Sequence, residues 1–109
     1  MVSLEMTNQP ISEQYRLAAL EWVDLDNAAR LLEETKTIAL NTSMKALGDL
    51  PVTSAEREVK CTVAWKDFVT DMVKARTEAN KAKCKLEYLR MRHAEQQSLE
   101  ASKRAEMRL

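Results

Sequence analysis

The chain has 109 residues, 31% of them charged, with a formal net charge of zero, one glycine and two prolines. This composition excludes a sheet-rich domain, which needs many turn residues, and its few aromatic side chains exclude a large globular core. It is typical of long helices and coiled coils, so we expect an all-α protein with a single helical domain over residues 12–109.

The chain begins with a segment that we expect to be a tail, residues 1–11. Pro10 opposes a helix in the residues before it, because a proline keeps the preceding residue out of the helical conformation. Ser12 is a candidate N-cap, and a first helix should follow from about residue 12 to residue 47.

Apolar and small side chains recur along this helix at three- and four-residue steps and predict one buried stripe. The stripe consists of Leu17, Leu20, Ala28, Leu31, Leu32, Thr35, Ile38, Ala39, Thr42, Ala46 and Leu47. Asp24 interrupts it, so a kink or a new helix start at Asp24–Asn27 is the alternative to one continuous helix.

A turn is predicted at residues 48–53. Gly48 can adopt the left-handed conformation that closes a helix, and Pro51 prevents the helix from continuing. Thr53 and Glu56 fit a capping box at the start of a second helix. With no glycine or proline after residue 52, this helix should run from residue 54 to about residue 107.

The second helix carries two interleaved series of side chains at seven-residue steps. They are Trp65, Met72, Ala79, Leu86 and His93, and Cys61, Phe68, Ala75, Ala82, Leu89 and Gln96. Together they predict a coiled-coil-like seam and a long antiparallel helical hairpin in which Ala28 lies opposite about Val73. The last twenty residues of the second helix would then extend beyond the first helix, where the seam becomes polar.

Charge also favours this pairing. Residues 1–58 have a net charge of −5 and residues 59–109 one of +5, so the two arms of a hairpin would attract each other.

We expect no enzymatic activity, metal or cofactor. His93 is the one histidine, glycine-rich loops are absent, and Cys84 lies about 13 Å along a helix from His93, too far to share a metal ion. Cys61 and Cys84 are likewise too far apart on one helix for a disulfide. Unpaired thiols, the lack of a secretory signal and the lack of an apolar run that could span a membrane indicate a cytoplasmic protein.

A second apolar stripe lies off the seam, at Cys84, Tyr88 and Met91. A hairpin covers one side of each helix only, so this stripe predicts association, with Arg92 and Glu95 among the charged residues at its rim. We favour a homodimer of hairpins. A host or phage protein is another candidate partner, and a tail that folds back through Leu4, Met6 and Ile11 is the alternative cover.

The second helix also carries a local excess of basic residues, which suggests nucleic-acid binding as the alternative function. These residues are Lys74, Arg76, Lys81, Lys83, Lys85, Arg90 and Arg92. We favour instead a solvated face that complements acidic residues of the first helix, because the bases are spread around the helix and aromatic side chains for base stacking are nearly absent.

Residues 72–109 resemble small helical proteins encoded by tailed bacteriophages and prophages. The resemblance is carried by the stretches 75–80 (ARTEAN), 85–92 (KLEYLRMR) and 104–109 (RAEMRL). It implies a bacterial host cytoplasm and an accessory role, such as modulating or inhibiting a host protein, and it implies no active-site residue.

Overall fold

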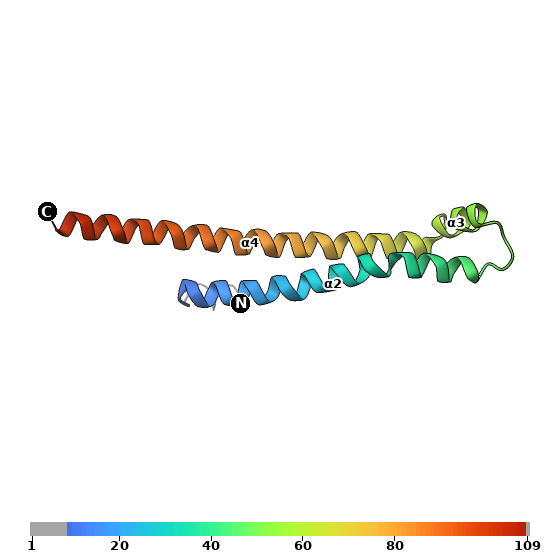
Figure 1. The fold of residues 1–109 in the computed structure, drawn as a ribbon, viewed down its shortest axis with the longest axis horizontal. Coiled ribbons are helices and arrows are strands. Elements are labelled where there is room, and N and C mark those ends of the chain that lie inside the picture. Colours follow the sequence, from blue (N-terminus) through green and yellow to red (C-terminus); the bar gives the residue numbers. More distant parts are fainter. Residues whose placement is uncertain (1–8, 109) are drawn as a thin grey trace. The chain divides into compact units, whose positions relative to one another are not determined.

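The structure, a computed structural model, describes residues 9–108. It contains three helices within this range: α2 (Ile11–Lys45), α3 (Val52–Lys60) and α4 (Val63–Met107). The predicted all-α class and the antiparallel packing of two long helices are confirmed, as Figure 1 shows. Residues 1–8 of the predicted tail lie outside the described residues, and of the rest Ile11 already belongs to α2.

The chain divides into two compact units, each built from both long helices. Unit 1 comprises residues 1–23 and 80–109, so its described part pairs the start of α2 with the second half of α4. Unit 2 is the continuous stretch 24–79, which contains the rest of α2, all of α3 and the start of α4.

The helix α2 starts and stops at backbone signals. The carbonyl of Pro10 accepts hydrogen bonds from the N–H groups of Glu13 and Gln14, both at 3.0 Å, so Ser12 lies inside the helix and is not its N-cap. At the other end Gly48 has φ of +85°, as predicted for the residue that closes the helix. The helix is unbroken at Asp24–Asn27, so no new helix starts there.

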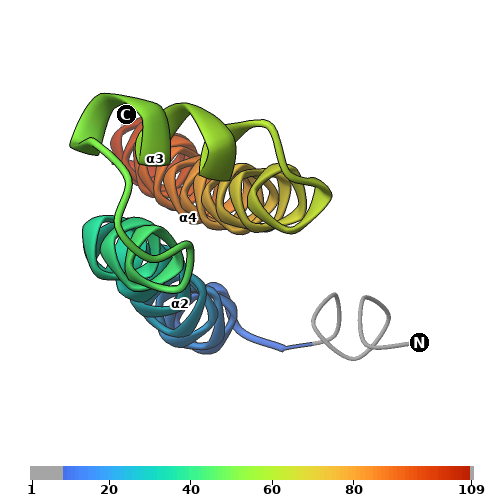
Figure 2. The ribbon, with the colours of Figure 1, turned by 90° about the vertical axis from the view of Figure 1, so that its right-hand side faces the viewer.

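The predicted second helix is two helices, which corrects the expected continuous run from residue 54. The first of them, α3, begins at Val52, directly after Pro51. No side-chain cap forms at its start, so the predicted capping box of Thr53 and Glu56 is wrong. The helix α3 then ends at Lys60, and Figures 1 and 2 show it folded back beside the first turns of α4. Burial of Ala55 and Val59 accounts for this position.

Thr62 makes the break between α3 and α4. Its hydroxyl donates to the carbonyl oxygen of Val59 at 2.6 Å and accepts the N–H of Trp65 at 3.1 Å. The first bond helps to close α3, and the second is the N-cap bond that threonine forms at a helix start. A side chain, and not a glycine or proline, therefore separates the two helices.

The seam of α4 follows the predicted register between Trp65 and Leu89. Trp65, Ala79, Ala82 and Leu89 are buried, and Phe68, Met72, Ala75 and Leu86 are partly buried. The rings of Trp65 and Phe68 stack with centroids 5.5 Å apart. Cys61 was placed on this seam wrongly, because it lies exposed at the break before α4.

The register predicted for α2 is partly wrong. Leu20, Ala28, Leu31 and Ile38 are exposed, whereas Ala18 and Ala29 are buried. The helix carries two apolar stripes at similar spacing, and the one that packs inward combines these two alanines with the partly buried Trp22, Leu25 and Leu32. The small side chains of Ala18 and Ala29 let the two helix backbones approach closely at these positions.

Candidate functional site

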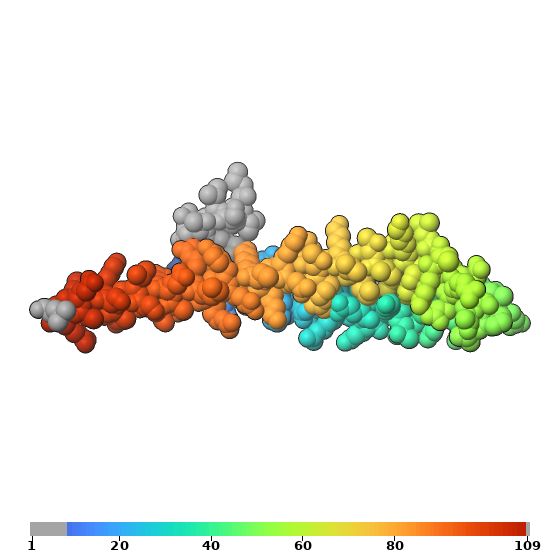
Figure 3. All heavy atoms as spheres, turned by 90° about the horizontal axis from the view of Figure 1, so that it is seen from above, coloured from blue at the N-terminus to red at the C-terminus, as the bar shows by residue number. Residues whose placement is uncertain are grey.

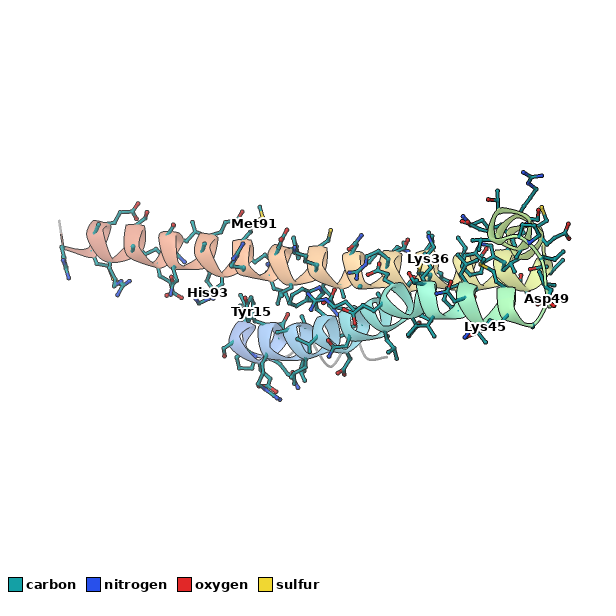
Figure 4. The ribbon with its side chains drawn as sticks, turned by 45° about the vertical axis from the view of Figure 1, so that its right-hand side comes forward. Tyr15, Lys36, Lys45, Asp49, Met91 and His93 are labelled. Atoms are coloured by element: carbon teal, nitrogen blue, oxygen red, sulfur yellow. The ribbon has the colours of Figure 1, made fainter. Side chains whose placement is uncertain are left out.

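The candidate interface lies on the second half of α4, in unit 1. Cys84 is exposed, Tyr88 is 58% exposed and Met91 is 62% exposed. Figure 4 shows Met91 on the side of α4 away from α2, whereas Tyr15 and His93 lie where the two helices face each other. Unit 1 therefore leaves this apolar stripe uncovered by its own described residues.

The stripe continues into a part of α4 with no buried residue. Every residue from Arg90 to Arg108 is exposed, including Leu99, and the side chains of these last turns project on the face shown in Figure 3. Since α2 contributes only residues 11–23 to unit 1, α4 extends beyond it, as expected from the polar seam after Leu89.

Two open grooves flank α4 where α2 begins, and neither was foreseen from the sequence. One, of about 660 Å³, brings Arg92 and Glu95 beside residues 9–11 and Gln14, with Gln96 and Leu99. The other, of about 290 Å³, lies between Ile11, Ser12 and Tyr15 on one side and Arg90 and His93 on the other. Arg92 and Glu95 thus border both the apolar stripe and the first turn of α2.

The basic residues predicted for nucleic-acid binding do not form one face. Lys85 Nζ lies 3.5 Å from Glu21 of α2, and Lys83 and Arg90 line a groove with Tyr15 and Trp22. Arg92 lines a different groove, while Lys74 and Lys81 are exposed. The complementary-charge interpretation therefore accounts for more of these residues than a phosphate-binding face does.

Arg76, the seventh basic residue, is held inside unit 2. Its Nη1 lies 2.7 Å from Oδ1 of Asp26, and its Nη2 and Nε bind both carboxylate oxygens of Glu33. The Arg76 hydrogen bond lowers the pKa of Glu33, and the two carboxylates raise the pKa of Arg76. A guanidinium bound to two carboxylates has few N–H groups left for a phosphate.

The described residues form no metal-binding cluster. No three of their His, Cys, Asp and Glu side chains are placed to hold a metal ion, and both cysteines are unpaired and exposed. In the same part of the chain, no helix has the length and apolar character that crossing a bilayer requires.

Unit 2 has exposed apolar residues of its own. On α2, Leu31 is 64% exposed and Ile38 is 66% exposed, and the two lie about two helical turns apart. Val52 and Val63 are also exposed, at the starts of α3 and α4. The predicted hydrophobic stripe of α2 contained the first two residues, but helical periodicity does not reveal which of two stripes faces the partner helix.

The fold and its surface define an all-α protein built on an antiparallel helical hairpin, with large apolar side chains exposed on both long helices. Comparison with protein-family models, with curated proteins and with solved structures found no match to this chain.

Proposed function

We propose that the chain is a non-enzymatic protein that works by binding protein, and that its partner at α4 is a second copy of itself. The exposure of Tyr88 and Met91 on one helix face carries this proposal. Burying apolar surface is the main favourable term in protein association, and large exposed apolar patches commonly mark interaction sites.

The last turns of α4 give a second reason to expect a partner. Helices in water depend more on packing than on intrinsic propensity, and residues 90–108 bury no side chain in the described structure. A partner helix on the Cys84–Tyr88–Met91 stripe would supply packing next to this segment.

The proposal extends to an accessory role of phage or prophage type, which rests on the resemblance of residues 72–109 alone. A host protein bound by the same stripe would serve such a role. Nucleic-acid binding ranks second because Arg76 and Lys85 lie beside carboxylates of the chain itself.

Sedimentation equilibrium at micromolar concentration tests self-association. We expect the wild-type chain to sediment above its monomer mass of 12.5 kDa, and the double variant Tyr88→Glu with Met91→Glu to sediment as a monomer. The matched control is Leu20→Glu with Val23→Glu, which changes two exposed apolar residues of α2 in the same unit. A wild-type chain that remains monomeric at high concentration would contradict the proposal, as would equal losses in both double variants.

A further inference from the structure

A groove runs along one side of unit 1 between α2 and α4. It joins two adjoining hollows, of about 290 Å³ and about 150 Å³, which share Tyr15 of α2 and Arg90 of α4 in their walls. The smaller hollow extends to Trp22 on one side and to Lys83 on the other. Since Lys83 lies seven residues before Arg90, this groove, the Tyr15 groove, follows α4 for about two helical turns.

The wall that α2 contributes to the Tyr15 groove is uncharged and rich in apolar surface. Its side chains are those of Ile11, Ser12, Tyr15 and Trp22. Aromatic rings offer large contact areas, and the hydroxyl of tyrosine and the indole N–H of tryptophan add polar groups at their edges. This wall therefore suits the apolar side of a partner.

The wall that α4 contributes is charged. Lys83 and Arg90 are exposed, and neither has an ion pair with another residue of the part of the chain that the structure describes. They lie about 10.5 Å apart along the helix axis. Two basic groups without carboxylates of their own are available to carboxylates of a partner, and such charge-assisted hydrogen bonds are the stronger kind.

We propose that the Tyr15 groove binds an acidic helical segment of another protein, which lies along α2 and α4 as a third helix. Two carboxylates of this segment, two helical turns apart, meet Lys83 and Arg90. Apolar side chains between the carboxylates cover Tyr15 and Trp22. Amphipathic helices commonly bind in apolar grooves, and complementary charge at the rim gives such contacts their specificity.

Glu87 favours a peptide over a nucleic acid in the Tyr15 groove. It lies between Lys83 and Arg90 in the sequence and lines the groove with them. A nucleic-acid strand carries a negative charge on every nucleotide, so a strand that follows both bases also passes the carboxylate of Glu87. A peptide carries acidic residues only where its sequence places them and meets Glu87 with an uncharged or basic residue.

This inference goes beyond the self-association proposed above and does not depend on it. Figure 4 shows Met91, in the apolar stripe, on the side of α4 away from α2, whereas Tyr15 lies where the two helices face each other. The variant Tyr88→Glu with Met91→Glu therefore leaves the Tyr15 groove intact. We expect it to bind an acidic helix as tightly as the wild type does, so the two proposals fail or stand separately.

A designed peptide tests the groove with the full wild-type chain. The probe is a fluorescein-labelled, alanine-rich helix with two glutamates seven residues apart and two leucines between them, and fluorescence anisotropy measures its binding. We expect a dissociation constant in the micromolar range, raised about tenfold when the glutamates become glutamines and about tenfold when the leucines become serines. These changes leave the protein itself unaltered. A probe that does not bind at about 1 mM protein would overturn the proposal.

Charge exchange locates the binding site. Lys83→Glu with Arg90→Glu should weaken binding of the glutamate probe at least tenfold and should bind a probe with lysines in place of the glutamates. Lys103→Glu with Arg104→Glu makes the same change of charge on α4 beyond the groove and should leave the affinity for the glutamate probe unchanged. Circular dichroism checks that both variants keep their helix content. Equal losses in the two variants would overturn the proposal.

Other occupants of the groove give other results, and each would overturn the proposal. Oligothymidylate that binds more tightly than the peptide, and is lost in Lys83→Glu with Arg90→Glu, would assign the groove to nucleic acid. Loss of self-association in the same variant would assign it to a second copy of the chain. A tenfold gain in affinity for the probe in Leu4→Ser with Met6→Ser would assign it to residues 1–8 of the chain itself.

Discussion

Arg76 of α4 binds Asp26 of α2 through a hydrogen bond of 2.7 Å from Nη1 to Oδ1. The same guanidinium donates hydrogen bonds to Glu33, about two helical turns further along α2, from Nη2 at 2.7 Å and from Nε at 2.8 Å. The side chain of Asp26 is only 14% exposed, so its contact with Arg76 is shielded from water more than an ordinary surface pair. One side chain thereby fixes the pairing of α2 and α4 within unit 2.

We expect Arg76→Gln to lower the thermal unfolding midpoint more than Lys74→Gln does. Both variants remove one positive charge from the same part of α4, but Lys74 is exposed and Arg76 bridges two carboxylates. Loss of the guanidinium leaves the shielded Asp26 without this partner, which is costlier than losing a solvated charge. Thermal melts followed by circular dichroism measure the difference, and equal midpoints for the two variants would show that the bridge does not stabilise unit 2.

The same bridge predicts a dependence of stability on pH. The hydrogen bond from Arg76 holds the pKa of Glu33 below its usual value, so the folded-state pKa lies below that of the unfolded chain. Glu33 therefore contributes stability above the unfolded pKa, and this contribution is lost as the pH falls through the folded pKa. Urea unfolding between pH 7 and pH 3 should show a larger loss for the wild type than for Arg76→Gln. Parallel curves for the two proteins would contradict this linkage.

Thr62 should be required for the junction between α3 and α4. Thr62→Ala removes both hydrogen bonds of the hydroxyl and should reduce the free energy of unfolding by about 1 kcal/mol, a typical value for losing an N-cap. Thr62→Ser keeps the hydroxyl and should change it by less than about 0.5 kcal/mol. Chemical denaturation provides the comparison, and an alanine variant as stable as the serine variant would rule out the capping role.

Trp65 should contribute most to the packing at the start of α4. It is 9% exposed and stacks on Phe68, so Trp65→Ala should cost about 3 kcal/mol or more. Val63→Ala, two residues away at an exposed position, should cost less than about 0.5 kcal/mol. Phe68→Ala should fall between them because Phe68 is only partly buried. A loss at Val63 that matches the loss at Trp65 would mean that this end of α4 packs differently.

The sequence predicts the helical class, the stop at Gly48 and the α4 seam because each rests on a local or periodic signal. Gly48 closes a helix through its own backbone conformation, and Pro51 three residues later prevents the helix from continuing. The seam of α4 repeats at seven-residue steps from Trp65 to Leu89, whereas the second stripe is confined to Cys84, Tyr88 and Met91, so the longer repeat identifies the packed face. The break at Thr62 was missed because threonine is tolerated within helices, although a threonine three residues before a buried tryptophan was an available capping signal. The bridge at Arg76 depends on which residues of another helix face it, which composition and spacing do not specify.

The last prediction concerns the face of α2 that packs inward. The register predicted for this helix from its periodicity was partly wrong. Leu31 and Leu32 are neighbours of the same residue type, yet Leu31 is 64% exposed and Leu32 is partly buried. Leu32→Ala should therefore reduce the free energy of unfolding by about 2 kcal/mol, near the lower limit for such a truncation because its burial is incomplete. Leu31→Ala should change it by less than about 0.5 kcal/mol. Both variants should be compared at a concentration where the chain is monomeric, so that association does not add to the measured stability. A larger loss at Leu31 than at Leu32 would mean that α2 turns its other stripe toward α4.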